Sequence, residues 1–184
     1  MYREVEVKYP LKNPDHVREV LTKLEAKSTS KAQTQEDTYY VPAHRNFLEP
    51  DIVSEWLRIR ITPKKCSINY KLWLPFGSEK PTHCDEYETE VENPEALEMI
   101  LMSLNMTKIV TVKKERSTWL YKDIEIALDT VEGLGTFIEL EGKSDSEDVS
   151  AVYEVLQKMK DILEADTLEQ DYRGYPYQLL HRSK

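Results

Sequence analysis

The chain has 184 residues, of which 25 are basic and 34 acidic, and its formal net charge is −9 at neutral pH. This length suits one domain of ordinary size, so we expect a single domain over residues 1–184. The acidic balance argues against a nucleic-acid partner. Two cysteines without a CxxC pair argue against a disulfide framework or a zinc ribbon. The N-terminus carries no leader-like apolar segment and no apolar run reaches membrane-spanning length, so we expect a cytoplasmic protein without a membrane partner.

The first two predicted elements are a strand over residues 3–10 and the helix that follows it. Alternation places Glu4, Glu6 and Lys8 on one face of the strand and apolar side chains on the other. A strand whose polar face meets water would show the same pattern. The helix begins at an Asn-Pro pair, with Asn13 as its expected N-cap. The apolar face of this helix consists of Val17, Val20, Leu21 and Leu24.

Three charged strands and a second helix are predicted in the middle of the sequence. The strands cover residues 55–62, 67–75 and 85–92. The polar residues on their charged faces are Arg58 and Arg60, then Asn69 and Lys71, then Glu86, Glu88, Glu90 and Glu92. The second helix covers residues 93–105 and also begins at an Asn-Pro pair. Its expected apolar face consists of Leu97, Ile100, Leu101 and Leu104.

The last predicted elements are strands over residues 110–121, 123–131 and 135–142, and a helix within residues 145–165. The charged residues on these strands are Lys114 and Arg116, then Glu125 and Asp129, then Glu139 and Glu141. The apolar face of the helix consists of Val149, Val152, Tyr153, Leu156, Met159 and Leu163. Because each of the three helices has a single apolar face, each is expected to cover a sheet.

Two architectures agree with strands that are charged on one face and apolar on the other. In the first, an open antiparallel sheet carries helices on its apolar face and exposes its charges to water. In the second, the sheet closes into a barrel with helices outside and a charged, wet interior. Acidic and basic residues are segregated strand by strand, but the pattern alone does not decide between the two architectures.

The chemistry of the charged face points to a polyphosphate. Residues two apart on a strand lie roughly 6.6 Å apart along the backbone, so two carboxylates at this spacing can bind one divalent ion. The candidate pairs for Mg²⁺ or Mn²⁺ are Glu4 with Glu6 and Glu139 with Glu141. The basic residues that could hold a polyanion are Arg58, Arg60, Lys71, Lys114 and Arg116. Carboxylates and basic groups in one cavity predict a metal-chelated polyphosphate as the ligand.

The order of these motifs resembles the CYTH superfamily, the triphosphate tunnel metalloenzymes. The Glu4-x-Glu6-x-Lys8 sequence is similar to the superfamily's N-terminal signature. Further similar segments, in chain order, are QEDTYYV (35–41), LRIR (57–60), YKL (70–72), DEYETEV (85–91), KKERSTW (113–119) and IALDTVEGLGTFIELEG (126–142). The resemblance implies an α+β fold, in which an eight-stranded antiparallel barrel closes around a charged interior and helices pack outside.

The resemblance also implies roles for individual residues. The metal ligands it implies are Glu4, Glu6, Asp129, Glu139 and Glu141. The triphosphate-binding residues it implies are Lys8, Arg58, Arg60, Lys71, Lys114, Arg116, Glu86 and Glu88. The residues it implies for the chemistry are Lys8, Arg58, Arg60, Lys71 and Asp129. Where relatives often carry an arginine before the acidic middle strand, this sequence reads His83-Cys84-Asp85, so which of the four following glutamates meets the ligand stays open.

Within the superfamily the sequence looks most like the class IV adenylyl cyclases, which convert ATP into cyclic AMP and pyrophosphate with a divalent metal. Two alternatives remain open. One is a triphosphatase acting on tripolyphosphate, thiamine triphosphate or a nucleoside triphosphate, and the other is a polyphosphate- or nucleotide-binding module without turnover. The C-terminal QDYRGYPYQLL resembles the superfamily's closing segment, expected as a packed lid or a final strand. A monomer and a homodimer are both compatible with the sequence.

Overall fold

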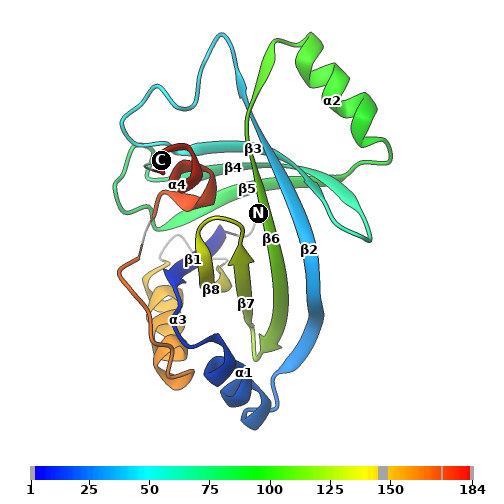
Figure 1. Cartoon of the computed structure of the whole chain (residues 1–184). Helices are drawn as coiled ribbons and strands as arrows, with labels where there is room; N and C mark the ends of the chain where they lie inside the picture. The colour runs from blue at the N-terminus through cyan, green and yellow to red at the C-terminus, as the bar shows by residue number, and fades with distance from the viewer. Residues whose placement is uncertain (1–2, 145–148, 171, 183–184) are drawn as a thin grey trace. The chain divides into compact units, whose positions relative to one another are not determined.

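The computed structural model describes residues 3–144, 149–170 and 172–182. Within these residues the chain forms eight strands and four helices, and the strands pair antiparallel with their neighbours, so the predicted α+β class is confirmed (Figure 1). The strands are β1 Arg3–Pro10, β2 Lys27–Pro42, β3 Glu55–Ile61, β4 Cys66–Leu74, β5 His83–Glu90, β6 Met106–Tyr121, β7 Ile124–Val131 and β8 Gly135–Ser144. The helices are α1 Pro14–Lys23, α2 Pro94–Ser103, α3 Ser150–Ile162 and α4 Gly174–Leu180.

The chain divides into two compact units, which we describe separately. The first unit comprises the described part of residues 1–33 and 114–172, and the second that of residues 34–113 and 173–184. In the first unit the strand order is β6-β7-β8-β1. In the second it is β2-β3-β4-β5, and the pairing is antiparallel in both. The closure of the sheet into a tunnel and the assignment of the chain to one domain stay predictions.

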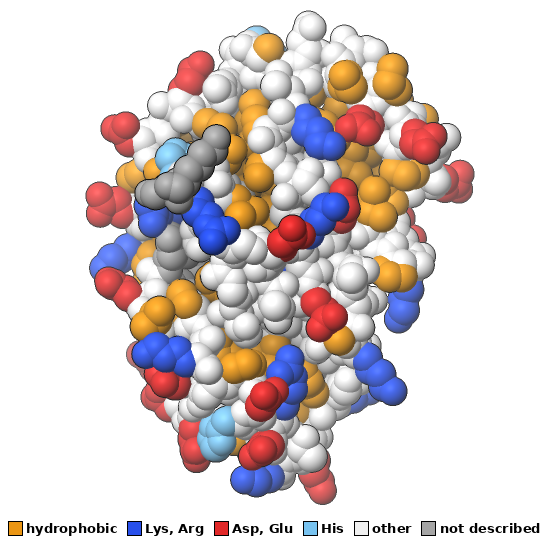
Figure 2. Space-filling model, in the orientation of Figure 1, with side chains coloured by type: hydrophobic (Ala, Val, Ile, Leu, Met, Phe, Trp, Pro, Cys, Tyr) orange, Lys and Arg blue, Asp and Glu red, His pale blue; other side chains and the backbone are white. Residues whose placement is uncertain are grey.

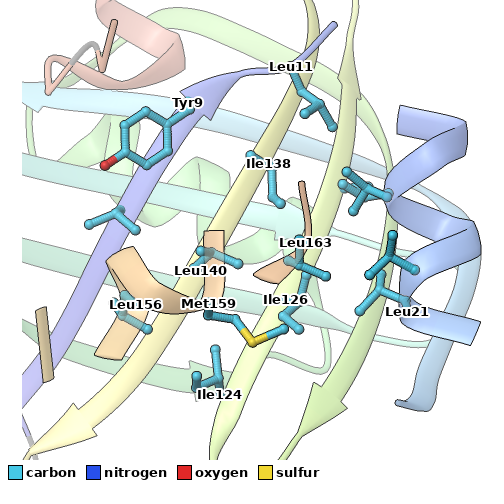
Figure 3. Packing of buried hydrophobic residues seen from close by; sticks show 14 of the residues in the cluster. Tyr9, Leu11, Leu21, Ile124, Ile126, Ile138, Leu140, Leu156, Met159 and Leu163 are labelled. Atoms are coloured by element: carbon cyan, nitrogen blue, oxygen red, sulfur yellow. The ribbon is translucent and has the colours of Figure 1, made fainter. Parts of the chain in front are cut away.

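The core of the first unit lies where the apolar face of its strands meets α1 and α3 (Figure 3). Ile138 and Leu140 of β8 are fully buried, as the period-two pattern predicts. Leu156 and Leu163 of α3 pack on the same cluster and are also fully buried. Burying a side chain of this size stabilises the fold by about 1.5–3 kcal/mol. The predicted apolar face of the third helix is therefore confirmed for Leu156, Met159 and Leu163 and wrong for Tyr153, which is 38% exposed. Residues 145–148 lie outside the described residues.

The two asparagines predicted as N-caps behave differently. The Asn93 side chain accepts a hydrogen bond from the backbone N–H of Ala96 at 2.9 Å, which is a capping bond. Asn13 occupies the N-cap position of α1 but makes no capping bond. Instead, its amide donates to the carbonyl oxygen of Glu164, and its side-chain oxygen accepts from the backbone N–H of Asp166. Capping by the Asn13 side chain was a wrong prediction, because this side chain fastens the segment after α3.

One core cluster of the second unit lies where α2 packs on the apolar face of β2 and β3. Leu101 of α2 contacts Tyr40 and Ile59 there. Ile100 and Leu104, which were expected on the same face of the helix, are 54% and 63% exposed. The prediction of one buried face is therefore correct for Leu101 and wrong for the other two.

The C-terminal segment forms α4 rather than a final strand. Tyr175 and Pro176 of this helix are buried. Pro176 is tolerated because it lies in the first turn, where backbone N–H groups have no partner within the helix.

Candidate functional site

In the second unit, four strands carry polar side chains on the face opposite α2. Residues that pair across antiparallel strands share a face. The register pairs Arg60 with Asp37, Arg58 with Asn69, and Lys71 with Glu86. The structure therefore brings together the predicted site residues of this unit, Arg58, Arg60, Lys71, Glu86 and Glu88.

Asp37 binds both arginines of β3. Arg60 donates to its two carboxylate oxygens from Nε and Nη2, each at 2.7 Å, and Arg58 donates from Nη1 at 3.4 Å. Burial alone would lower the pKa of Arg58, but Asp37, Tyr39 and Glu86 together outweigh burial and raise this pKa above its usual value. Arg58 therefore stays charged. The sequence placed Asp37 in the QEDTYYV segment (35–41), which resembles the superfamily, but indicated no role for this residue. Its pairing with the two arginines depends on the register between β2 and β3.

Asn69 and Lys71 organise the carboxylates of β5. The Lys71 ammonium lies 2.8 Å from Glu86, and the Asn69 amide donates to both Glu86 and Glu88. Lys65 pairs with both Glu88 and Glu90, but the Glu90 side chain is 72% exposed, whereas that of Glu88 is 34% exposed. Glu92 lies beyond the end of β5. Of the four eligible glutamates, Glu86 and Glu88 are thus the two that lie among the basic residues of this face.

In the first unit, Asp129 of β7 binds the two basic residues of β6. Arg116 donates from Nε and Nη2, each at 2.6 Å, and Lys114 donates at 3.1 Å. Burial alone would raise the pKa of Asp129, but the charges of Arg116 and Lys114 lower it to about 2. Both carboxylate oxygens of Asp129 accept hydrogen bonds from Arg116 or Lys114. To bind a metal directly, Asp129 would have to give up one of these hydrogen bonds.

Lys8 of β1 lies between two carboxylates on the charged face of the first unit. Its ammonium is 2.6 Å from Glu6 and 3.0 Å from Glu139. Burial alone would lower the pKa of Lys8, but the charges of Glu139 and Glu6 outweigh burial and raise this pKa. Lys8 is therefore a permanent cation at neutral pH, suited to bind an anion and unsuited to act as a general base.

The predicted metal ligands lie on the same face of β1 and β8. The register places Glu6 opposite Glu141, Lys8 opposite Glu139, and Glu4 opposite Lys143. Glu125 of β7 is also opposite Glu141, so a further carboxylate lies in this row. Carboxylate oxygens are the ligands that Mg²⁺ and Mn²⁺ prefer, and this donor set fits either ion.

Residues 2–175 match the CYTH domain family. The chain belongs to this family. A Methanocaldococcus jannaschii protein, provisionally named an adenylate cyclase, is 35% identical over 168 residues, which are 91% of each chain. The PH1819 protein of Pyrococcus horikoshii has a solved structure that is similar with a TM-score of 0.79 at 28% identity, over 98% of this chain and 99% of that one. A Hippeastrum protein, provisionally named an adenylyl cyclase and described as having a dominant triphosphatase activity, is similar with a TM-score of 0.60 at 16% identity, over 96% of this chain and 94% of that one.

These findings confirm the family that the ordered motifs indicated. In this CYTH chain, cations suited to phosphate and carboxylates suited to a divalent metal share the charged faces of the strands. Among the described residues, none of the helices combines the length and the apolar character needed to cross a membrane.

Proposed function

We propose that this CYTH protein is a divalent-metal-dependent enzyme that acts on triphosphate substrates inside a β-tunnel. In this proposal the eight strands close into one ring and one domain, with charged faces inside and helices outside. The burial of polar and charged side chains supports closure, since Asp37 and Asn69 are 1% exposed and Asp129 is 0% exposed. An open sheet would leave such a face in water.

The observation that carries the proposal is the Nε–H group of Arg58. It is buried and has no hydrogen-bond partner among the described residues. A buried donor without a partner costs free energy, which a phosphate oxygen on this face would recover. A guanidinium also matches the geometry of phosphate oxygens.

We assign the basic residues to the triphosphate and the carboxylates to the metal. The triphosphate ligands are Lys8, Arg58, Arg60, Lys71, Lys114 and Arg116. Glu86 and Glu88 position Lys71 and its neighbour Asn69, and Asp129 positions Lys114 and Arg116. The residues that would hold Mg²⁺ or Mn²⁺ are Glu4, Glu6, Glu139 and Glu141. A metal ion bound there would neutralise phosphate charge and lower the pKa of the attacking group.

The reaction we infer is that of a class IV adenylyl cyclase. The 3′-hydroxyl of ATP gives up its proton to solvent and attacks the α-phosphorus, the bond from this phosphorus to the bridging oxygen of the leaving group breaks, and pyrophosphate departs. The chain holds the triphosphate in line and stabilises the charge that develops on pyrophosphate. The M. jannaschii relative, provisionally named for this activity, supports the choice.

A triphosphatase is the second candidate. The residues assigned above recognise phosphate and metal, and none of them is assigned to adenine. Tripolyphosphate, thiamine triphosphate and nucleoside triphosphates would therefore also fit. The triphosphatase activity ascribed to the Hippeastrum protein, which is similar in fold, supports this candidate. A binding module without turnover is the third candidate.

Product analysis separates the three candidates. The protein is incubated with ATP, tripolyphosphate or thiamine triphosphate, with Mg²⁺ or Mn²⁺ and with a chelator. We expect cyclic AMP and pyrophosphate from ATP; orthophosphate release would identify a triphosphatase, and calorimetric binding without products would identify a module. Glu139→Gln keeps the shape of the side chain and should abolish turnover while circular dichroism stays unchanged. Full activity of the wild type in chelator, or of Glu139→Gln, would contradict the metal assignment.

A further inference from the structure

Three buried polar atoms without a hydrogen-bond partner lie on one face of the second unit. Among the described residues, four buried side-chain nitrogen or oxygen atoms have no such partner. Of these, Nε of Arg58 is assigned above to the triphosphate, and Nε2 of Gln178 belongs to α4. The other two are Oε1 of Gln35 on β2 and Oγ of Ser67 on β4. Neither Gln35 nor Ser67 has a part in the function proposed above.

Gln35 and Ser67 are both neighbours of Arg60 on the charged face. Ser67 is directly opposite Arg60 in the register between β3 and β4. Asp37 is opposite Arg60 on the other side, and Gln35 precedes Asp37 by two residues. Gln35 therefore shares this face and is the diagonal neighbour of Arg60. The Cβ atoms of such neighbours lie about 5 Å apart when opposite and about 7 Å apart when diagonal, so a group bound beside Arg60 is within reach of both side chains.

The burial of Gln35 and Ser67 means that a missing hydrogen bond costs free energy. Polar side chains on the outside of the protein meet water, as Figure 2 shows for the interspersed Lys, Arg, Asp and Glu of one face. Gln35 and Ser67 are only 7% and 1% exposed. Folded proteins keep few buried polar groups without a partner, and those that remain often serve a ligand or an ordered water. Two such groups beside a phosphate-binding arginine therefore indicate a ligand group that completes them.

The hydrogen-bonding chemistry of this pair identifies the ligand group. Oε1 of Gln35 only accepts hydrogen bonds, whereas the hydroxyl of Ser67 donates or accepts. A phosphate oxygen is itself an acceptor, so it can pair with Ser67 but not with Oε1 of Gln35. A hydroxyl group of the ligand satisfies both, because it donates to one and accepts from the other. A hydroxyl within a few bonds of a phosphate is a feature of the sugar of a nucleoside triphosphate. Tripolyphosphate has no such hydroxyl, and the one alcohol of thiamine is esterified in thiamine triphosphate.

We propose that Gln35 and Ser67 form a subsite for a sugar hydroxyl of a nucleoside triphosphate. This inference rests on the proposed function, because the phosphate that Arg60 holds places the sugar beside the subsite. On its other side Ser67 is opposite Glu90, whose side chain is 72% exposed, so solvent reaches this end of the sheet. A site that binds a hydroxyl discriminates against an analogue without it, because the groups of the site are then left unpaired. The subsite therefore favours ATP over tripolyphosphate and thiamine triphosphate.

The affinities for ATP and for tripolyphosphate test the subsite. KM gives the affinity for the compound that the protein consumes, and inhibition constants give it for the other compounds as competitors. Gln35→Ala and Ser67→Ala should each weaken ATP about tenfold and leave tripolyphosphate within about twofold, since each removes one hydrogen bond to the sugar. Ser103→Ala, at an exposed serine of α2, is the matched control and should behave as the wild type does. Because Oγ of Ser67 has no partner among the described residues, Ser67→Ala should not lower the free energy of unfolding in urea.

The deoxy analogues of ATP identify the hydroxyl. Of 2′-deoxy-ATP and 3′-deoxy-ATP, the one that lacks the bound group should bind the wild type about tenfold more weakly than ATP does. The same analogue should bind Ser67→Ala and Gln35→Ala about as well as ATP does, because the two changes remove the same interaction.

Three results would overturn the subsite. Equal losses of affinity for ATP and tripolyphosphate would show that these side chains serve the phosphates or the fold. Unchanged affinity for both compounds in both variants would show that ordered water alone completes the two groups. A wild type that binds tripolyphosphate but not ATP would exclude the subsite and leave the triphosphatase candidate standing. The proposed function fails separately, if the wild type binds none of these triphosphates.

Discussion

Asp37 and Asp129 play the same part in the two units. Each is a buried carboxylate that binds two basic residues, which lie two apart on the neighbouring strand. In both cases one arginine donates from Nε and Nη2, and the second basic residue makes a longer bond. A buried ion pair contributes little net stability but fixes geometry. We therefore interpret both aspartates as residues that orient two basic side chains for binding a phosphate.

The lowered pKa of Asp129 makes stability depend on pH. Because its pKa is about 2 when folded and 3.8 in the ordinary state, the ionised group stabilises the fold above about pH 4. This contribution is lost as the pH falls through 2 and amounts to about 2 kcal/mol. The Asp129→Asn variant lacks this contribution. Its free energy of unfolding should therefore be lower than that of the wild type above about pH 4, and the difference should shrink as the pH falls. Urea unfolding at several acidic pH values measures the difference.

The control for this prediction is Asp15→Asn, since the Asp15 side chain is 92% exposed. Its unfolding free energy should follow that of the wild type at every pH. If the curves of Asp129→Asn and the wild type run parallel through the acidic range, the carboxylate does not titrate as described.

The two arginines of β3 should differ in kinetics. Arg60 donates two hydrogen bonds to Asp37, from Nε and Nη2. The Nε–H group of Arg58, in contrast, has no hydrogen-bond partner among the described residues. Removing a donor that meets transition-state charge lowers kcat about a hundredfold or more. We expect that effect for Arg58→Ala, and incomplete rescue by Arg58→Lys because an ammonium lacks the planar fork. Arg60→Ala should mainly raise KM.

Steady-state kinetics on whichever triphosphate the wild type consumes provides the measurement. Lys113→Ala is the control, since Lys113 is 59% exposed and pairs with Glu36. Wild-type kinetics in both Arg58 variants would mean that this arginine does not face the ligand.

At the scale of elements, the close approach of α3 to β8 depends on Gly142. A Cβ atom at this position would lie 2.8 Å from Cγ1 of Val152. Gly142→Ala should therefore destabilise the fold by about 1–3 kcal/mol, as overpacked core positions do. Val152→Ala removes the methyl groups that a Cβ at position 142 would meet. The double variant should therefore lose less free energy of unfolding than the two single variants lose together. Urea unfolding of the four proteins measures this coupling, and strictly additive losses would show that the contact is not limiting.

The strands were predictable from the sequence because side chains alternate strictly between the faces of a sheet. That rule alone placed Arg58, Lys71 and Glu139 on charged faces and Leu140 in the core. The ion pairs were not predictable, since the contact of Asp37 with Arg60 requires the register between β2 and β3. Register follows from the packing of whole strands, which no local pattern specifies.

The predicted apolar faces of α1 and α3 meet the core, whereas α2 was predictable in place but not in orientation. α2 has apolar residues around most of its circumference, so periodicity could not identify which of them meet the sheet. The segment that forms α4 lacks a helical pattern long enough to be recognised, and a strand or lid was equally compatible with its tyrosines.

For the whole molecule, the two units share two strands. β2 and β6 run through residues of both units as regular strands, without a linker. Because these strands continue from one unit into the other, we expect the second unit to depend on the first.

This dependence predicts that both units unfold in one transition. Tryptophans provide separate probes, because Trp119 belongs to the first unit and Trp56 and Trp73 to the second. Trp119→Phe leaves probes in the second unit, and Trp56→Phe with Trp73→Phe leaves one in the first. In each variant the fluorescence midpoint in urea should coincide with the midpoint from circular dichroism, which follows both units. A second-unit fluorescence transition at lower urea than the dichroism transition would show that the units fold separately, against the single domain proposed here.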